Sequence, residues 1–142
     1  MSHRATLEAL FDDWWAGRLE AIADRFAADA VWHFSAATKP PAIGREAIMA
    51  FLTAYAAGAV ATRLRLLRAA EDGDTLFIEA VEDFDTAAGR SVLVPYAGVL
   101  TFRDGLITDW RDYFDRALVD GQITGTAALP DYAQDLLEPP GR

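Results

Sequence analysis

The stretch that decides the fold is RDGLITDWRDYFD, residues 103–115. Asp104-Gly105 is a strong hairpin turn signal, so residues 106–114 are predicted to form the last strand of an antiparallel meander. Because side chains alternate across a strand, one face is expected to carry Leu106, Thr108, Trp110, Asp112 and Phe114. Removing a charged carboxylate from water without a partner is costly. Asp112 is therefore the first candidate functional residue.

The same alternation singles out two further polar groups in the preceding strands. Residues 75–85 place one acid in an otherwise apolar row: Leu76, Ile78, Ala80, Glu82 and Phe84. Residues 91–103 give a second row: Val92, Val94, Tyr96, Gly98, Leu100 and Phe102. The lone polar group of that row is the Tyr96 hydroxyl, so each of the last three strands has one polar exception on its apolar face.

The register of the last hairpin can be predicted by making the two apolar faces coincide. The connection is then three residues, 104–106, with Arg103 opposite Ile107 and Asp112 opposite Gly98. A glycine at that position leaves open space beside the acid. In the same register Tyr96 lies opposite Phe114, and a comparable register of the preceding hairpin sets Glu82 near Tyr96 or Val94.

We therefore expect Glu82, Tyr96 and Asp112 to converge on one apolar cavity. Neighbouring carboxyl groups in a low-dielectric site do not both ionise easily, so at least one should have a raised pKa. Such a pair offers a proton donor and a base, and Tyr96 can donate a hydrogen bond to an oxyanion. Structural alternatives remain open: Asp112 pairs with an arginine, Glu82 is a bulge residue that points outward, or Tyr96 is an ordinary core tyrosine.

The remaining segments predict an α+β fold, a curved antiparallel sheet with helices against its concave face. Helical periodicity predicts a first helix ending near Gly17, and the next two at about 19–26 and 44–58. Expected strands cover residues 30–34 and 60–69, and Pro40-Pro41 places residues 35–43 in a loop. Residues 116–142 are interpreted as a short helix followed by an extended tail that packs against the body.

Composition narrows the class of protein. The 142 residues are most simply one domain, with the body at about 5–118 and a C-terminal tail at about 119–142. The net charge of −9 argues against nucleic acid and anionic membrane surfaces as partners. Cysteine is absent, and the two histidines lack metal-ligand spacing, so no metal site is expected. No signal peptide or membrane span is recognised, so the expected location is the cytoplasm.

The layout together with WRDYFD at 110–115 resembles the nuclear transport factor 2-like superfamily, whose members are cone-shaped α+β barrels with a deep pocket. DGLITDWRDYFD is most similar to the branch of limonene-1,2-epoxide hydrolase and the SnoaL-like polyketide cyclases. Gly44-Arg45-Glu46-Ala47-Ile48 is also typical of the superfamily. The resemblance implies that Asp112 matches the hydrolase's catalytic aspartate, the base toward the attacking water, and that no cofactor is needed.

Three positions depart from the hydrolase pattern. That pattern has an arginine two residues before a second aspartate; here Ala80 replaces the arginine, whereas Glu82 keeps an acid at the second position. The tyrosine and asparagine that help to hold the hydrolytic water correspond to Trp32 and Phe34. Ketosteroid isomerase uses a base near position 34, where phenylalanine cannot serve. The resemblance implies a substrate pocket lined by Trp32, Phe34, Ile78, Ala80, Phe84, Gly98, Trp110 and Phe114.

Two functional hypotheses follow. The first is a small-molecule enzyme that acts on an apolar substrate by carboxylate acid/base catalysis, with Asp112, Glu82 and Tyr96 as catalytic residues. Its reaction would be epoxide hydrolase-, cyclase- or isomerase-like. The alternative is a non-catalytic module of the same fold that binds a hydrophobic ligand or dimerises. Under both hypotheses we expect a homodimer through the outer sheet face, where Leu93, Val99 and Ile107 are predicted to be exposed.

Overall fold

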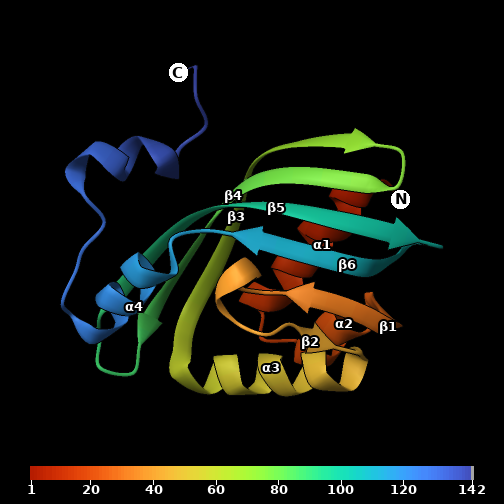
Figure 1. Cartoon of the computed structure of the whole chain (residues 1–142), viewed down its shortest axis with the longest axis horizontal. Helices are drawn as coiled ribbons and strands as arrows, with labels where there is room; N and C mark the ends of the chain where they lie inside the picture. Colours follow the sequence, from red (N-terminus) through yellow and green to blue (C-terminus); the bar gives the residue numbers. More distant parts are fainter. Residues whose placement is uncertain (142) are drawn as a thin grey trace.

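A single six-stranded curved sheet that does not close into a barrel organises the computed structural model, which describes residues 1–141 (Figure 1). The strand order is β2-β1-β6-β5-β4-β3. The strands are β1 (Phe26–His33), β2 (Ala42–Ile43), β3 (Ala59–Asp72), β4 (Thr75–Thr86), β5 (Ser91–Arg103) and β6 (Leu106–Tyr113). Strands β3 to β6 form the predicted antiparallel meander, whereas β1 pairs in parallel with β6. The sheet is therefore mixed, and the predicted α+β class is confirmed.

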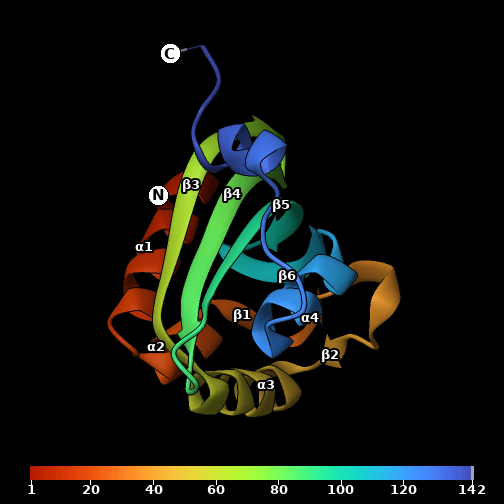
Figure 2. The ribbon, with the colours of Figure 1, turned by 90° about the vertical axis from the view of Figure 1, so that its left-hand side faces the viewer.

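Helices pack on the sheet and supply part of the core (Figure 2). They are α1 (His3–Trp15), α2 (Leu19–Ala23), α3 (Arg45–Gly58) and α4 (Arg116–Thr124), with 3-10 turns η1 (Ala36–Thr38) and η2 (Asp131–Leu137). The Ser2 hydroxyl caps α1 by accepting from the Ala5 N–H at 3.0 Å. Leu7 and Leu10 of α1 and Leu52 of α3 are fully buried in the core that the inner sheet face also forms.

The predicted inner row of β5 is confirmed, because every one of its members is buried: Val92, Val94, Tyr96, Gly98, Leu100 and Phe102. Three predicted boundaries are wrong. Helix α2 ends at Ala23 because Phe26 begins β1, which pairs with Ile107. The strand expected at 30–34 therefore spans residues 26–33. The expected loop at 35–43 contains η1 and β2, whose Ala42 pairs with Trp32.

In the β5–β6 hairpin the predicted three-residue connection is wrong, but the predicted pairing of Asp112 with Gly98 is confirmed. Its turn is two residues, Asp104-Gly105, both with positive φ (53° and 79°), so Arg103 pairs with Leu106. A β-bulge at position 108 then shifts the ladder by one residue, and Asp112 lies opposite Gly98 as predicted.

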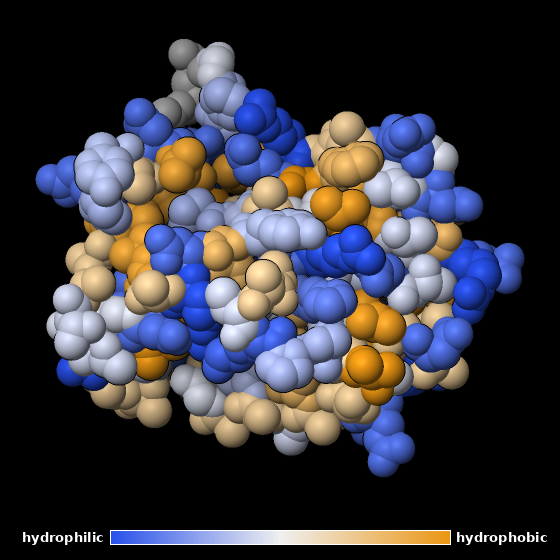
Figure 3. Space-filling view, viewed as in Figure 1, coloured by the Kyte–Doolittle hydropathy of each residue, from blue (hydrophilic) through white to orange (hydrophobic). Residues whose placement is uncertain are grey.

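The bulge has a consequence for the outer face. Ile107 turns inward and is fully buried, so its predicted exposure is wrong. Leu93 and Val99 are partly exposed. On the face drawn in Figure 3, polar and apolar residues are interspersed. The homodimer stays a prediction. Across residues 1–141 no helix is both long and apolar enough to cross a membrane.

Helix α4 packs against β5, and the tail that was expected to be extended contains the 3-10 helix η2. The Asp115 carboxylate caps α4 by accepting from the Leu118 N–H at 3.0 Å. The Gln122 side chain of α4 fixes the helix on β5, because it accepts from the Leu93 N–H at 2.9 Å and donates to the Leu93 carbonyl at 3.0 Å. Helix α4 thereby becomes one wall of the internal cavity.

Candidate active site

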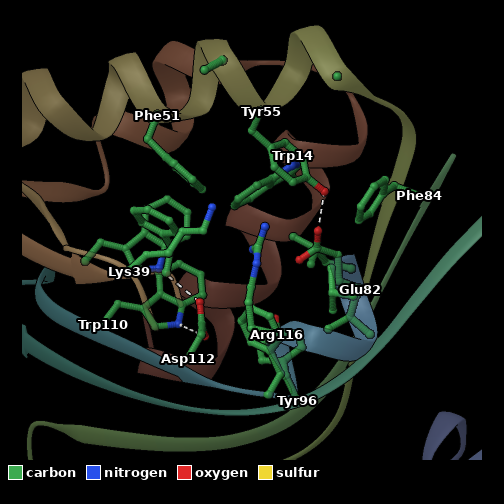
Figure 4. A pocket seen from close by; sticks show the side chains of 18 of the residues that line it. Trp14, Lys39, Phe51, Tyr55, Glu82, Phe84, Tyr96, Trp110, Asp112 and Arg116 are labelled. Carbon is green, nitrogen blue, oxygen red and sulfur yellow. Dashed lines mark hydrogen bonds between the residues drawn. The ribbon is translucent and has the colours of Figure 1, made fainter. Parts of the chain in front are cut away.

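An internal cavity of about 430 Å³ lies between the sheet, α3 and α4, and both predicted acids reach it (Figure 4). This volume falls in the range of small-molecule pockets, about 300–1,000 Å³. Most of the wall is aromatic or aliphatic. Six polar side chains interrupt it: Lys39, Tyr55, Glu82, Tyr96, Asp112 and Arg116.

Asp112 projects from β6 into the cavity and is 8% exposed. Its Oδ1 accepts a hydrogen bond from the Trp110 Nε1–H at 2.7 Å, and its Oδ2 accepts one from the Trp32 Nε1–H at 3.2 Å. Within the described chain no arginine or lysine pairs with this carboxyl group. Its partners are thus two neutral indoles that hold both oxygens in place.

The pKa of Asp112 is raised to about 8. Burial is the main cause, because a low-dielectric wall disfavours the charged form. The indole N–H groups of Trp32 and Trp110 oppose that effect, and the charge of Glu82 adds to it. At pH 7 the carboxyl group is therefore mostly protonated while it faces the cavity, the state that a general acid requires.

Glu82 projects from β4, where it lies opposite Val94, one of the two neighbours predicted for it. The Tyr55 hydroxyl of α3 donates a short hydrogen bond to Glu82 Oε1, and Thr62 Oγ1 lies 3.5 Å from the same hydroxyl. Burial raises the pKa of Glu82, while the Tyr55 hydrogen bond and the Arg116 charge lower it. Glu82 is thus a second acid held inside the molecule, tied to a tyrosine from the facing helix.

Tyr96 of β5 lines the cavity near both acids. Burial is the largest cause that raises its pKa well above the usual value, and the charges of Asp112 and then Glu82 raise it further. The hydroxyl therefore keeps its proton and can act only as a neutral donor or acceptor. The three polar groups predicted from strand alternation thus share one cavity.

The predicted substrate-lining residues fall into two sets. Five line the cavity: Trp32, Phe34, Phe84, Trp110 and Phe114. The other three, Ile78, Ala80 and Gly98, point to the inner face but are not among the lining residues, because that end of the sheet is filled by the core of α1. Gly98 matters in another way: a Cβ built on it would lie 3.0 Å from Asp112 Oδ1.

Sequence reasoning missed three polar members of the wall. Tyr55 lies in the apolar repeat of α3, where periodicity alone cannot separate a core tyrosine from a site tyrosine. Lys39 follows η1 in the segment expected to be a loop, and Arg116 opens α4 just after the last strand. For one of these residues the composition could have drawn attention to the position, because Lys39 is the only lysine in the sequence.

The fold and the cavity define a class of protein: an α+β domain of the nuclear transport factor 2-like superfamily, with a pocket inside a curved sheet. Residues 7–110 match the model of the SnoaL-like domain, so the chain belongs to the SnoaL-like domain family. No curated protein matches the chain significantly.

Solved structures with the same fold include proteins described by different activities. A hypothetical protein with a ketosteroid isomerase-like fold from Catenulispora acidiphila, in complex with trimethylamine, is 26% identical (TM-score 0.75; 84% of this chain, 92% of that one). An LEH-like epoxide hydrolase of M. tuberculosis is 19% identical (TM-score 0.72; 86% and 89%). A putative SnoaL-like polyketide cyclase from Jannaschia sp. CCS1 is 20% identical (TM-score 0.73; 87% and 91%).

Proposed function

We propose that this protein is a cofactor-independent enzyme that transfers a proton to or from a small apolar molecule held in the cavity. The observation that carries the proposal is the environment of Asp112, a buried carboxyl group with no cationic partner among residues 1–141, two indole donors and an open space in front of it. Such an arrangement costs folding free energy, which is typical of a functional site.

Asp112 would be the group that exchanges the proton with the substrate. Its raised pKa, about 8, makes it a competent acid at neutral pH, and its ionised fraction is a stronger base than an ordinary aspartate. Trp32 and Trp110 hold the carboxyl group in one orientation, which keeps the transfer geometry fixed.

Tyr96 and the Tyr55–Glu82 pair would assist. The protonated Tyr96 hydroxyl is suited to donate a hydrogen bond to a developing oxyanion. Glu82, held by Tyr55, would supply a second acid/base group for a reaction that moves two protons, such as cyclisation or epoxide opening. The relatives of this fold include cyclases, isomerases and epoxide hydrolases, which supports this range of chemistry.

The family's epoxide hydrolysis mechanism is the weakest fit within this range. Ala80 stands where that pattern has its arginine, and Trp32 uses its N–H on Asp112 instead of holding a water. Proton transfer at carbon, as in cyclisation or isomerisation, needs an acid/base carboxyl group and an oxyanion donor, both of which line the cavity.

The proposal is tested by incubating the wild type and Asp112→Asn with cyclic ketones and terpene epoxides in D₂O. Solvent deuterium incorporation is followed by ¹H NMR, and ring opening or closure by mass spectrometry. We expect exchange or conversion by the wild type and a loss of about 10²–10⁴-fold in Asp112→Asn, the usual contribution of a positioned acid/base group. Equal turnover by the two proteins contradicts the assignment of Asp112.

The alternative is a binding module without turnover. The departures at positions 32, 34 and 80 motivate it. An interior filled by the protein's own side chains would have favoured a binding module, whereas the cavity is open and reaches both acids. Binding of cavity ligands without any Asp112-dependent conversion across the substrate panel would favour this alternative.

A further inference from the structure

The cavity is lined by two cationic side chains as well as by two acids. Two cationic side chains, Lys39 and Arg116, direct their nitrogen ends into it (Figure 4). Of the two acids in the wall, Asp112 is mostly protonated at pH 7. The Arg116 charge lowers the pKa of Glu82, and Arg116 also pairs with Asp120 at 2.9 Å. Among the described residues Lys39 is therefore the cavity cation without an acidic partner, in a chain whose net charge is −9.

Lys39 has no structural task that explains its position. It is the only lysine in the sequence, and within residues 1–141 it forms no ion pair or hydrogen bond. It follows the short η1 turn and precedes Pro40-Pro41, a segment that holds it at the edge of an aromatic wall. Lys39 is exposed to solvent while it lines the cavity, and its unpaired positive charge attracts an anion to that side of the cavity.

Arg116 is only loosely held by the protein. Its Nη2 pairs at 2.9 Å with Asp120, one turn along the same helix, and that carboxylate is 54% exposed. Its Nε is buried and has no hydrogen-bond partner within the described residues. An exposed i,i+4 pair contributes little, and an unpaired buried N–H is a cost. The guanidinium group is thus available to a ligand oxygen, for which its planar set of donors is suited.

We infer that the cavity binds an apolar small molecule that carries one oxyanion, such as a carboxylate or an enolate, with the oxyanion held by Arg116 and Lys39 and the apolar body against the aromatic wall. This inference names the substrate class and therefore rests on the proposed function. It assigns binding, not proton transfer, to the two cations. An anion bound here would also keep Asp112 protonated through its charge, because like charges disfavour ionisation.

The inference is tested with a matched pair of probes, 2-naphthoate and its neutral isostere 2-naphthamide, by isothermal titration calorimetry at pH 6 and low salt. Benzyltrimethylammonium serves as a cationic probe. We expect the wild type to bind naphthoate at least tenfold more tightly than the amide and to bind the cation more weakly than either. Arg116→Gln should bring the two naphthalene affinities together, and Lys39→Gln should reduce their ratio. Arg68→Gln is the matched control, because Arg68 pairs with Glu79 outside the cavity.

The single lysine gives a second, local readout. Reductive ¹³C-methylation keeps the charge and labels only Lys39 and the N-terminal amine, so two NMR signals report the experiment. The Lys39 signal should shift with naphthoate and not with naphthamide. Three results overturn the inference: tighter binding of the amide or of the cation than of naphthoate, an Arg116→Gln variant that binds naphthoate as tightly as the wild type does, or no binding of any probe.

Asp112→Asn separates this inference from the proposed function. The variant should retain the preference for naphthoate even though its turnover is lost, because the oxyanion contacts other residues. A wild type that prefers the acid but shows no Asp112-dependent conversion would refute catalysis and leave the ligand class intact. A wild type that converts neutral substrates in an Asp112-dependent way, without any preference for the acid, would refute only the ligand class.

Discussion

Gly98 lies directly opposite Asp112 in the β5–β6 ladder, and it provides the space that the carboxyl group occupies. A Cβ on residue 98 would lie 3.0 Å from Asp112 Oδ1 and 3.1 Å from Ile78 Cγ1. Both distances are shorter than ordinary van der Waals contact. The acid therefore keeps its orientation between the two indoles only because its cross-strand neighbour has no side chain.

Gly98→Ala should accordingly displace Asp112. We expect a loss of about 1–3 kcal/mol in unfolding free energy, the usual cost of overpacking, and a fall in any Asp112-dependent turnover. Chemical denaturation and the turnover assay measure the two effects. Gly58→Ala is the control for folding, because nothing lies within 4 Å of a Cβ there and its stability should change by less than about 1 kcal/mol. Full activity in Gly98→Ala would contradict this role of the glycine.

Asp112→Asn should stabilise the protein at neutral and alkaline pH. The pKa of Asp112, about 8, lies above its unfolded value of 3.8, so the folded state binds the proton more tightly. The wild type therefore loses stability as pH rises from about 4 to 8, and an uncharged asparagine escapes that loss. We expect the unfolding free energy to rise by about 1–3 kcal/mol at pH 8 and not to rise near pH 4. The gain is reduced because one indole N–H then faces the N–H₂ group of the asparagine amide.

The pKa of Asp13 is shifted in the opposite direction to that of Asp112. This buried carboxylate is paired at 2.8 Å with Arg18 and with Arg25. Burial raises its pKa, but the hydrogen bonds and charges of Arg25 and Arg18 outweigh burial and lower it below 3.8. Its stabilisation is present above pH 4 and is lost as pH falls further. Asp13→Asn should cost about 1–3 kcal/mol at pH 7 and little near pH 2, as followed by thermal melts.

Trp32→Phe should raise the pKa of Asp112 further, because it removes an N–H that stabilises the ionised form. A ¹³C NMR titration of the aspartate carboxyl groups measures this pKa directly. The limb of the pH–rate profile that reports Asp112 should move to higher pH by the same amount. Trp14→Phe is the matched control. Trp14 packs edge-on against Trp32, with the two ring centroids 5.8 Å apart, and makes no hydrogen bond to Asp112. An identical shift in both variants would mean that packing, and not the hydrogen bond, sets the pKa.

Tyr55→Phe should raise the pKa of Glu82, because burial remains as the main cause while the hydrogen bond that opposes it is removed. We expect a loss of about 1 kcal/mol in unfolding free energy at pH 7 and a smaller loss of turnover than in Asp112→Asn. Carboxyl NMR and denaturation provide the measurements. Tyr113→Phe, at a tyrosine that is 51% exposed, should change neither. An unshifted Glu82 would show that Tyr55 serves only as packing.

Much of the fold was predictable because local chemistry and strand alternation agree. The Asp104-Gly105 turn follows from the residues that such a turn needs. The row of β5 and the pairing of Asp112 with Gly98 follow from apolar residues that must share one face. The same alternation drew attention to Glu82, Tyr96 and Asp112, since a polar group in an apolar row stands out from its neighbours.

Other features could not be predicted locally. The two-residue turn and the bulge at position 108 cancel each other in register, so alternation gave the correct partner for Asp112 but the wrong side for Ile107. The parallel pairing of β1 with β6 joins segments about 80 residues apart, which no local signal records.

The sequence by itself determined the class of fold and the three polar residues on the inner sheet face, because apolar residues recur at every second position along each strand. Only the tertiary structure decided which groups surround those residues. It brings the Trp32 indole from β1 onto Asp112 and the Tyr55 hydroxyl from α3 onto Glu82, and it brings Lys39 and Arg116 to one cavity. Protonation depends on burial and on neighbours from distant segments, and those are set by packing across the whole chain.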